Sequence, residues 1–218
     1  YYCSFIYFLL FPYAADVKCF VESRDFYLKR GIPFRRGYLI SGTPGCGKQH
    51  WIYYLAAVLG REVCVLDMSH SNMKTYMCDP GLAIAVKELG SNSILVLKNI
   101  EAIPMRSTGK KKRESPRGEN EYGTLTYSGV LNVLDGAFAH SNGLITIMTT
   151  NRKDILDAEY MKRTVNALLR PGRCDMRIEI ATPTEEQIKM AVVRTFSPHY
   201  PQQEVEDAAE TFLNILKD

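Results

Sequence analysis

The sequence lacks the features that mark several common classes of protein. Its six cysteines include no C-x-x-C pair, which argues against a zinc cluster or a thioredoxin-like motif and favours free thiols in a reducing compartment. The apolar run that opens the chain ends at Pro12, well short of the roughly 20 residues that span a bilayer. The net charge of +3 is too small to indicate nucleic-acid binding. We therefore expect no nucleic-acid partner.

Two segments stand apart from the rest by composition. Residues 1–14 are strongly apolar, and we interpret them as a stub of uncertain origin, either part of a longer membrane segment or a strand from another domain. Residues 105–123 are polar and rich in Lys and Arg, which predicts a disordered basic insertion. An arm that contacts nucleic acid or anionic lipid is the alternative, but the glutamates of this segment weaken it.

The remaining sequence alternates short apolar runs with helical spacing. Residues 15–36 are expected to form a helix followed by a turn. Strands are expected at residues 37–41, 62–68, 93–100, 143–151 and 175–181. Apolar strands separated by helices are typical of an α/β fold in which a parallel sheet is covered by helices on both faces.

The last part of the chain is purely helical in pattern. Thr184 and Gln187 have the spacing of a capping box at the start of a helix. We expect residues 15–182 to form a nucleotide-binding domain and residues 183–218 to begin a small helical lid.

A glycine-rich loop follows the first expected strand and precedes a helix. Its sequence GTPGCGKQ matches the phosphate-binding pattern G-x-x-x-x-G-K-[S/T] except at Gln49, where a hydroxyl would hold Mg²⁺. The glycines allow backbone amides to face phosphates at the positive end of the helix dipole, and Lys48 would bridge the outer phosphates. The candidate nucleotide-binding residues are Gly42, Thr43, Pro44, Gly45, Cys46, Gly47, Lys48 and Gln49.

Three stretches together resemble the AAA superfamily of ATPases. They are RGIPFRRGYLISGTPGCGK, TYSGVLNVLDG and TTNRKDILDAEY with LLRPGRCD. Within that superfamily they are similar to the family of mitochondrial chaperones that assemble respiratory complex III. The resemblance implies a P-loop NTPase fold, a ring of identical subunits with ATP between them, and a membrane anchor outside this chain. It also implies a Rieske-type iron–sulfur protein as the protein substrate.

The resemblance implies acidic groups that this chain does not have. Family members end the third strand on two acids, which support Mg²⁺ and orient the attacking water, and a further acid follows. Lys98 and Asn99 occupy the two positions here, and Glu101 is the acid that remains. Asn99 cannot accept a proton, and Lys98 places a positive charge where a cation needs support. With Gln49 as a degenerate metal position, Mg²⁺ binding is disfavoured and hydrolysis is expected to be impaired.

Three other positions match polar residues of the family. Asn151 matches the sensor of the outermost phosphate. Arg170 and Arg173 match arginines that reach the site of the neighbouring subunit, although the extra segment at residues 161–167 could displace them. Together with Glu101 these residues are the candidate catalytic groups.

These observations lead to one expectation and two alternatives. We expect an ATP-binding module of a protein-assembly or translocation chaperone that hydrolyses ATP weakly or not at all. By resemblance it forms a homo-oligomeric ring at the mitochondrial inner membrane, and residues 1–218 alone would be soluble. The alternatives are an active ring ATPase that remodels or translocates protein, and a decayed fragment without function.

Overall fold

The computed structural model describes residues 3–69, 78–90, 92–103, 125–135, 143–152 and 167–215. The basic insertion expected at residues 105–123 lies outside the described residues. The segment at residues 161–167 is described only at its last residue.

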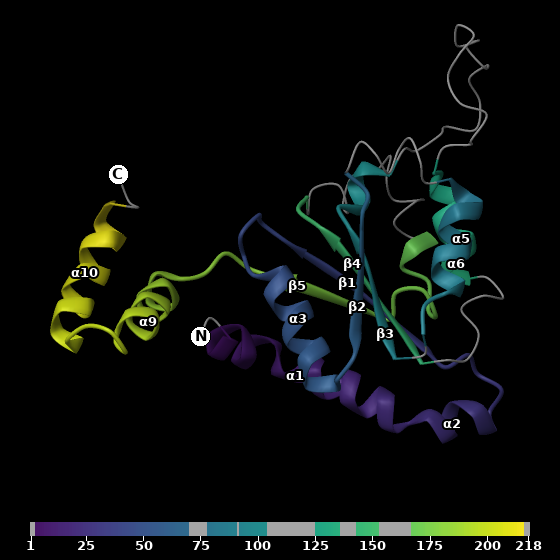
Figure 1. Ribbon diagram of the computed structural model, residues 1–218, viewed down its shortest axis with the longest axis horizontal. Coiled ribbons are helices and arrows are strands. Elements are labelled where there is room, and N and C mark those ends of the chain that lie inside the picture. Colours follow the sequence, from purple (N-terminus) through teal and green to yellow (C-terminus); the bar gives the residue numbers. More distant parts are fainter. Residues whose placement is uncertain are drawn as a thin grey trace, which may run out of the picture.

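Five parallel strands form one sheet in the order β2-β3-β4-β1-β5 (Figure 1). The strands are β1 (Arg35–Gly42), β2 (Glu62–Asp67), β3 (Ser93–Lys98), β4 (Leu144–Thr150) and β5 (Met176–Ile180). Each lies within about two residues of the expected run, and the predicted α/β fold is confirmed. Because all the strands are parallel, their carboxyl ends meet at one edge of the sheet. Ligands of such sheets bind at this edge.

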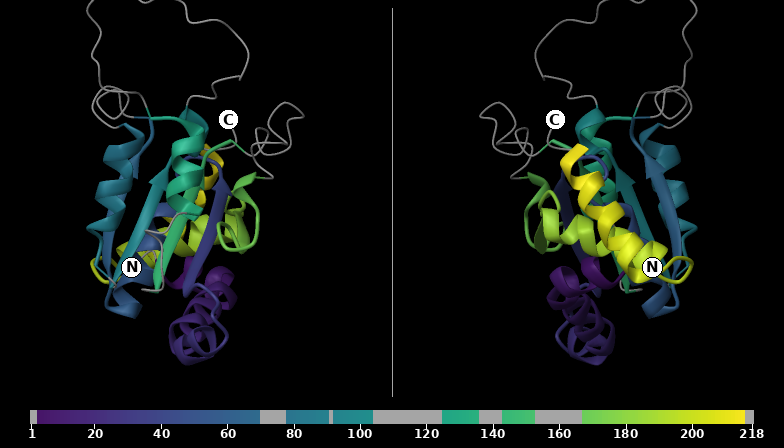
Figure 2. Two further views of the ribbon diagram at one scale, coloured as in Figure 1. Left: turned by 90° about the vertical axis from the view of Figure 1, so that its right-hand side faces the viewer. Right: turned by 90° about the vertical axis from the view of Figure 1, so that its left-hand side faces the viewer.

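Helices cover both faces of the sheet because successive strand residues point to opposite sides (Figure 2). Tyr38 and Ile40 of β1 pack with α1 (Cys3–Glu22) and α3 (Lys48–Leu59), where Trp51 is fully buried. The intervening residue Leu39 packs with α5 (Asp79–Lys87) and α6 (Tyr127–Asp135). A 3₁₀ turn, η1 (Ile100–Ala102), follows β3. The central strands β1, β3 and β4 are thus buried on both faces, as their continuous apolar sequences predict, whereas the edge strands β2 and β5 are partly exposed.

The first helix begins earlier than expected, since α1 starts at Cys3 and includes Pro12, and a short second helix α2 (Arg24–Lys29) follows it. A proline inside a helix removes one backbone hydrogen bond. Packing of α1 against α3 through the buried side chains of Val17 and Phe20 offsets this cost. Within the described residues no helix is both long and apolar enough to cross a membrane.

A partly buried polar contact joins α1 to the sheet. Arg36 donates to both carboxylate oxygens of Asp16 at 2.7 and 3.2 Å, and the Tyr38 hydroxyl donates to the same carboxylate at 2.6 Å. Burial, the hydrogen bond to Asp16 and the charge of that carboxylate all raise the pKa of Tyr38 far above its ordinary value. Paired Arg–carboxylate bonds of this kind hold two elements in a defined orientation.

The last two described helices, α9 (Glu185–Phe196) and α10 (Gln202–Ile215), form a hairpin that stands apart from the sheet (Figure 1). Thr184 and Gln187 make both bonds of the predicted capping box. The ammonium of Lys189 pairs with Glu210 across the hairpin at 2.5 Å.

Candidate nucleotide-binding site

The loop between β1 and α3 has a backbone conformation that depends on glycine. β1 ends at Gly42 and α3 begins at Lys48. Gly45 and Gly47 have φ values of 82° and 97°, which residues with a side chain rarely adopt. A Cβ at Gly42 would lie 2.5 Å from the backbone oxygen of Ile180. The loop therefore needs glycine at all three positions.

Lys48 turns back over the loop. Its ammonium donates to the carbonyl oxygens of Gly42 at 2.7 Å and Thr43 at 2.8 Å, and it lies 3.6 Å from Sγ of Cys46. Thr43 and Pro44 are exposed. The charge of Lys48 is thus held at the N-terminus of α3, where helix geometry favours an anion.

Gln49 lies on the exposed surface of α3. Its side-chain amide donates to the hydroxyl of Tyr53 one turn further along, at 3.3 Å. The longer amide side chain therefore follows the helix surface, and this position supplies no hydroxyl for a metal ion.

A carboxylate that the sequence interpretation missed lies at the end of β2. Asp67 pairs with Lys98 in the register of β2 and β3, and its Oδ2 lies 3.9 Å from the Lys98 ammonium. Its Oδ1 accepts from the backbone amide of Ser69 at 3.0 Å, from the Ser69 hydroxyl at 2.6 Å and from Asn99 at 2.9 Å. The one signal in the sequence was an acid that ends the second apolar run.

The environment of Asp67 keeps its carboxylate ionised. Partial burial alone would raise its pKa. Hydrogen bonds from Ser69 and Asn99, together with the charge of Lys98, outweigh burial and hold the pKa of Asp67 below its ordinary value.

Asn99 connects this carboxylate to the end of β4. Its backbone is left-handed, with φ 55° and ψ 52°, a conformation that asparagine tolerates better than most residues. Its Oδ1 accepts from the side-chain amide of Asn151 at 2.9 Å. The backbone amide of Asn151 donates to Oε1 of Glu101 at 3.2 Å, while Oε2 of Glu101 is buried without a hydrogen-bond partner. Asn99 and Glu101, which follow β3, thus lie in one hydrogen-bond network with Asn151, which follows β4.

The groups at this edge do not fit a divalent cation. Mg²⁺ prefers oxygen ligands, in particular carboxylates. Lys98 presents an ammonium, Asn99 uses its side-chain amide nitrogen on Asp67, and Glu101 binds the backbone of Asn151. In the part of the chain that the structure describes, no three His, Cys, Asp or Glu residues are grouped so that they could hold a metal ion.

The two candidate arginines lie at the other end of β1. The carboxylate of Asp175 accepts from the backbone amides of Gly37 and Gly172, both at 2.9 Å, and so ties the arginine turn to the start of β1. From Gly37 to Gly42 the strand rises about 16 Å. Arg170 is exposed, whereas Arg173 forms an ion pair with Asp135 at the end of α6. The structure therefore separates both arginines from the glycine loop of the same chain.

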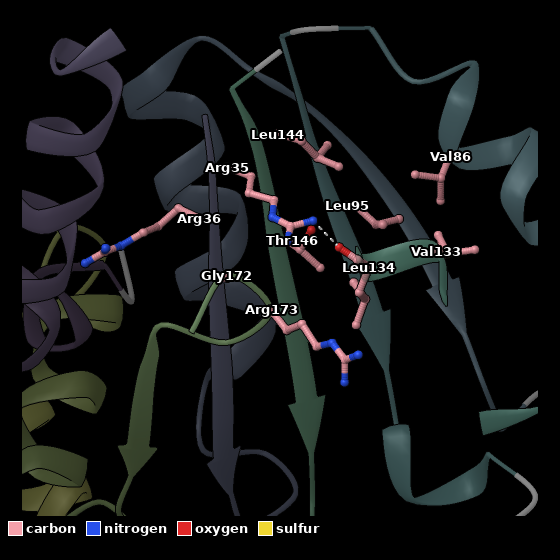
Figure 3. A pocket seen from close by; sticks show the side chains of 11 residues that line it. Arg35, Arg36, Val86, Leu95, Val133, Leu134, Leu144, Thr146, Gly172 and Arg173 are labelled. Carbon is pink, nitrogen blue, oxygen red and sulfur yellow. Dashed lines mark hydrogen bonds between the residues drawn. The ribbon is translucent and has the colours of Figure 1, made fainter. Parts of the chain in front are cut away.

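A small cavity lies beside Arg173 (Figure 3). It is lined by Arg35, Arg36, Gly37, Val86, Leu95, Val133, Leu134, Leu144, Thr146, Gly172 and Arg173. Arg35 crosses it and donates to the backbone oxygen of Leu134 at 2.5 Å, while its Nε is buried without a partner. Since Arg35 and Leu144 begin their strands, this cavity lies toward the amino ends of the strands and is distinct from the glycine loop.

Comparison with known proteins agrees with this architecture. Residues 38–182 match the ATPase family associated with various cellular activities (AAA). The mitochondrial chaperone BCS1 of Danio rerio is 35% identical over 193 residues, which cover 88% of this chain and 42% of the relative. The human protein of the same name is 34% identical over 188 residues, with 86% and 40% covered. Protein HYPER-SENSITIVITY-RELATED 4 of Arabidopsis thaliana is 35% identical over 179 residues, with 80% and 29% covered.

The chain thus spans less than half the length of these curated relatives. The matched region begins within β1 and contains the other four strands of the sheet and the glycine loop with α3. From this match and this fold together, the chain belongs to the AAA family of ATPases.

Proposed function

We propose that this chain is the ATP-binding module of a protein-assembly or translocation chaperone, and that it hydrolyses ATP slowly or not at all. The observation that carries the proposal is a glycine loop of the phosphate-binding type together with a third strand that ends on Lys98 and Asn99 in place of two acids. The loop keeps Lys48 and the glycine conformations, whereas the end of β3 presents Lys98 and Asn99.

Binding and hydrolysis depend on different parts of this site. Lys48 and the backbone amides of residues 45–49 would hold the phosphates at the N-terminus of α3. Hydrolysis also needs a group that orients the attacking water and a group that neutralises developing charge. Asn99 donates to Asp67 and accepts from Asn151, so its side chain is committed to the network. Loss of such groups reduces rates by orders of magnitude.

An active ring ATPase is the second candidate. The observation that favours it is the Oε2 atom of Glu101, which is buried and has no hydrogen-bond partner. A carboxylate oxygen in this state can accept a proton or a water molecule. In this alternative Glu101 takes the place of the missing acids.

The assembly is proposed from the family and from the position of the arginines. Arg170 is exposed and lies in the turn that Asp175 ties to the start of β1, far from the glycine loop of its own chain. An arginine so placed suits a phosphate site on a neighbouring subunit, which supports a homo-oligomeric ring. BCS1 is named a mitochondrial chaperone, and we therefore propose a mitochondrial location for this chain. From the family resemblance we propose the inner membrane, with an anchor outside these residues, and a Rieske-type iron–sulfur protein as the substrate.

The test measures binding and turnover on one purified sample. Fluorescent ATP should bind, and the variant Lys48→Ala should lose this binding because it removes the loop cation. Phosphate release in the presence of Mg²⁺ should stay far below about 1 s⁻¹, the low end of ordinary enzyme turnover. Release near that value, abolished by Glu101→Gln, would favour the active ATPase. Absence of binding would favour the decayed fragment.

A further inference from the structure

The residues at the carboxyl edge of the sheet do not suit a divalent cation, and this affects which form of the nucleotide the site can bind. Metal ions accompany nucleotide phosphates because they neutralise charge that the protein alone does not. Here the position expected to support the metal is Lys98, whose ammonium would repel a divalent cation. The same ammonium attracts phosphate directly.

Lys98 lies within reach of the phosphate loop. One strand, β4, separates β3 from β1, so their carboxyl ends are about 10 Å apart. The register places Leu97 beside Met148 and Ser41 beside Thr150, which brings Lys98 close to the level at which the loop begins. The flexible four-carbon stem of lysine can cover much of this distance.

Lys98 is also held loosely. Its one described ion-pair contact is the 3.9 Å approach to Oδ2 of Asp67, and its side chain is 30% exposed. Ion pairs of this length and exposure are weak. The three donors to Asp67 all bind Oδ1 and come from Ser69 and Asn99, so the carboxylate stays in place if Lys98 moves.

We propose that this site binds a nucleoside triphosphate without a divalent cation. Lys98 and Lys48 together neutralise the phosphates, and Asp67 is the counter-ion of Lys98 when no nucleotide is bound. The inference rests on the proposed function, because it concerns the same phosphate loop. It names the ligand of that loop as the metal-free nucleotide.

The experiment compares binding of a fluorescent ATP analogue in excess EDTA and in excess Mg²⁺. The unaltered chain should bind in EDTA at least as tightly as in Mg²⁺. Lys98→Met should weaken binding in EDTA by on the order of tenfold or more, the value of a charge-assisted contact. Lys98→Arg should keep most of the affinity. Lys18→Met, which removes an exposed lysine paired with Glu22 on α1, is the matched control and should bind like the unaltered chain.

The possible outcomes distinguish failure of the inference of metal-free binding from failure of the proposed function. Binding that requires Mg²⁺, or Lys98→Met binding as tightly as the unaltered chain in EDTA, would overturn the inference alone. Absence of binding in both buffers would overturn the proposed function. Circular dichroism verifies the fold of each variant. If Lys98→Met does not fold, Asp67→Asn decides, because loss of the counter-ion should tighten metal-free binding several-fold and an unchanged affinity would contradict the role of Lys98.

Discussion

Arg173 and Asp135 form an ion pair in which the arginine is the more buried partner and the aspartate is exposed. The Arg173 side chain is 10% exposed and also donates to the backbone oxygen of Ala167 at 2.5 Å. The hydrogen bond from Arg173 and its positive charge hold the pKa of Asp135 below its ordinary value, although burial acts in the opposite direction. This pair connects the arginine turn to the end of α6.

The variant Asp135→Asn should show how this pair depends on pH. A carboxylate whose pKa is lowered by folding stabilises the protein above its ordinary pKa and loses this effect as the pH falls through the lowered value. Near pH 7 the variant should therefore melt at a lower temperature than the unaltered chain. The difference should disappear as the pH is lowered well below 3.8, the ordinary value for aspartate. Melting curves from pH 7 to about pH 2 measure it, and a constant difference would contradict the assignment.

At the scale of elements, one side chain of α5 holds the residue that caps α6. Asp79 accepts from the backbone amide and the hydroxyl of Thr126, both at 2.7 Å, and the same hydroxyl accepts from the amide of Gly129 at 2.9 Å. A Cβ at Gly129 would lie 1.9 Å from the Asp79 carboxylate. The glycine thus allows the two helices to approach, and Val130 and Val133 on α6 are buried as a result.

Asp79→Ala should destabilise the fold by about 1–3 kcal/mol, because two donors at the start of α6 lose a charged acceptor. Asp79→Asn keeps one acceptor oxygen at the same place and should lose less. Urea denaturation followed by circular dichroism measures both variants. Equal stability of Asp79→Ala and the unaltered chain would show that water replaces this cap without cost.

At the scale of the whole molecule, the sheet and its helices form one compact layer structure, and α9 with α10 projects from it (Figure 1). Phe196, Phe212 and Ile215 of this hairpin are between 45% and 66% exposed. The site residues lie at two places, the carboxyl edge of the sheet and the arginine turn at the start of β1. In the proposed ring of subunits, the arginine turn of one copy would lie against the carboxyl edge of the sheet in the next copy.

The variants Arg170→Ala and Arg173→Ala should distinguish a role in subunit association from a role in the stability of the fold. Arg170 is exposed, so its removal should change the free energy of unfolding by less than about 0.5 kcal/mol. It should weaken ATP-dependent association in sedimentation velocity. Arg173→Ala should lower the melting temperature, because Asp135 and the backbone oxygen of Ala167 lose their partner. Association of Arg170→Ala equal to that of the unaltered chain would exclude an intersubunit role.

Local rules accounted for much of the fold and for the conformation of the glycine loop. The strand GYLIS, the glycine loop and the capping box at Thr184 were predictable because each depends on neighbouring residues. Asp67 was not predictable as a partner of Lys98 and Asn99. A crossover helix lies between β2 and β3, and the register of the two strands decides which side chains meet.

The sequence by itself determined the succession of strands and helices along the chain, the glycine loop and the absence of two acids at the end of β3. These follow from apolar periodicity, glycine conformation and the chemistry of single side chains. The tertiary structure decided that Asp67 is the counter-ion of Lys98 and that Arg173 is paired with Asp135 while Arg170 remains exposed. The physical reason is that contacts between residues remote in sequence depend on how parallel strands align and how helices pack against them.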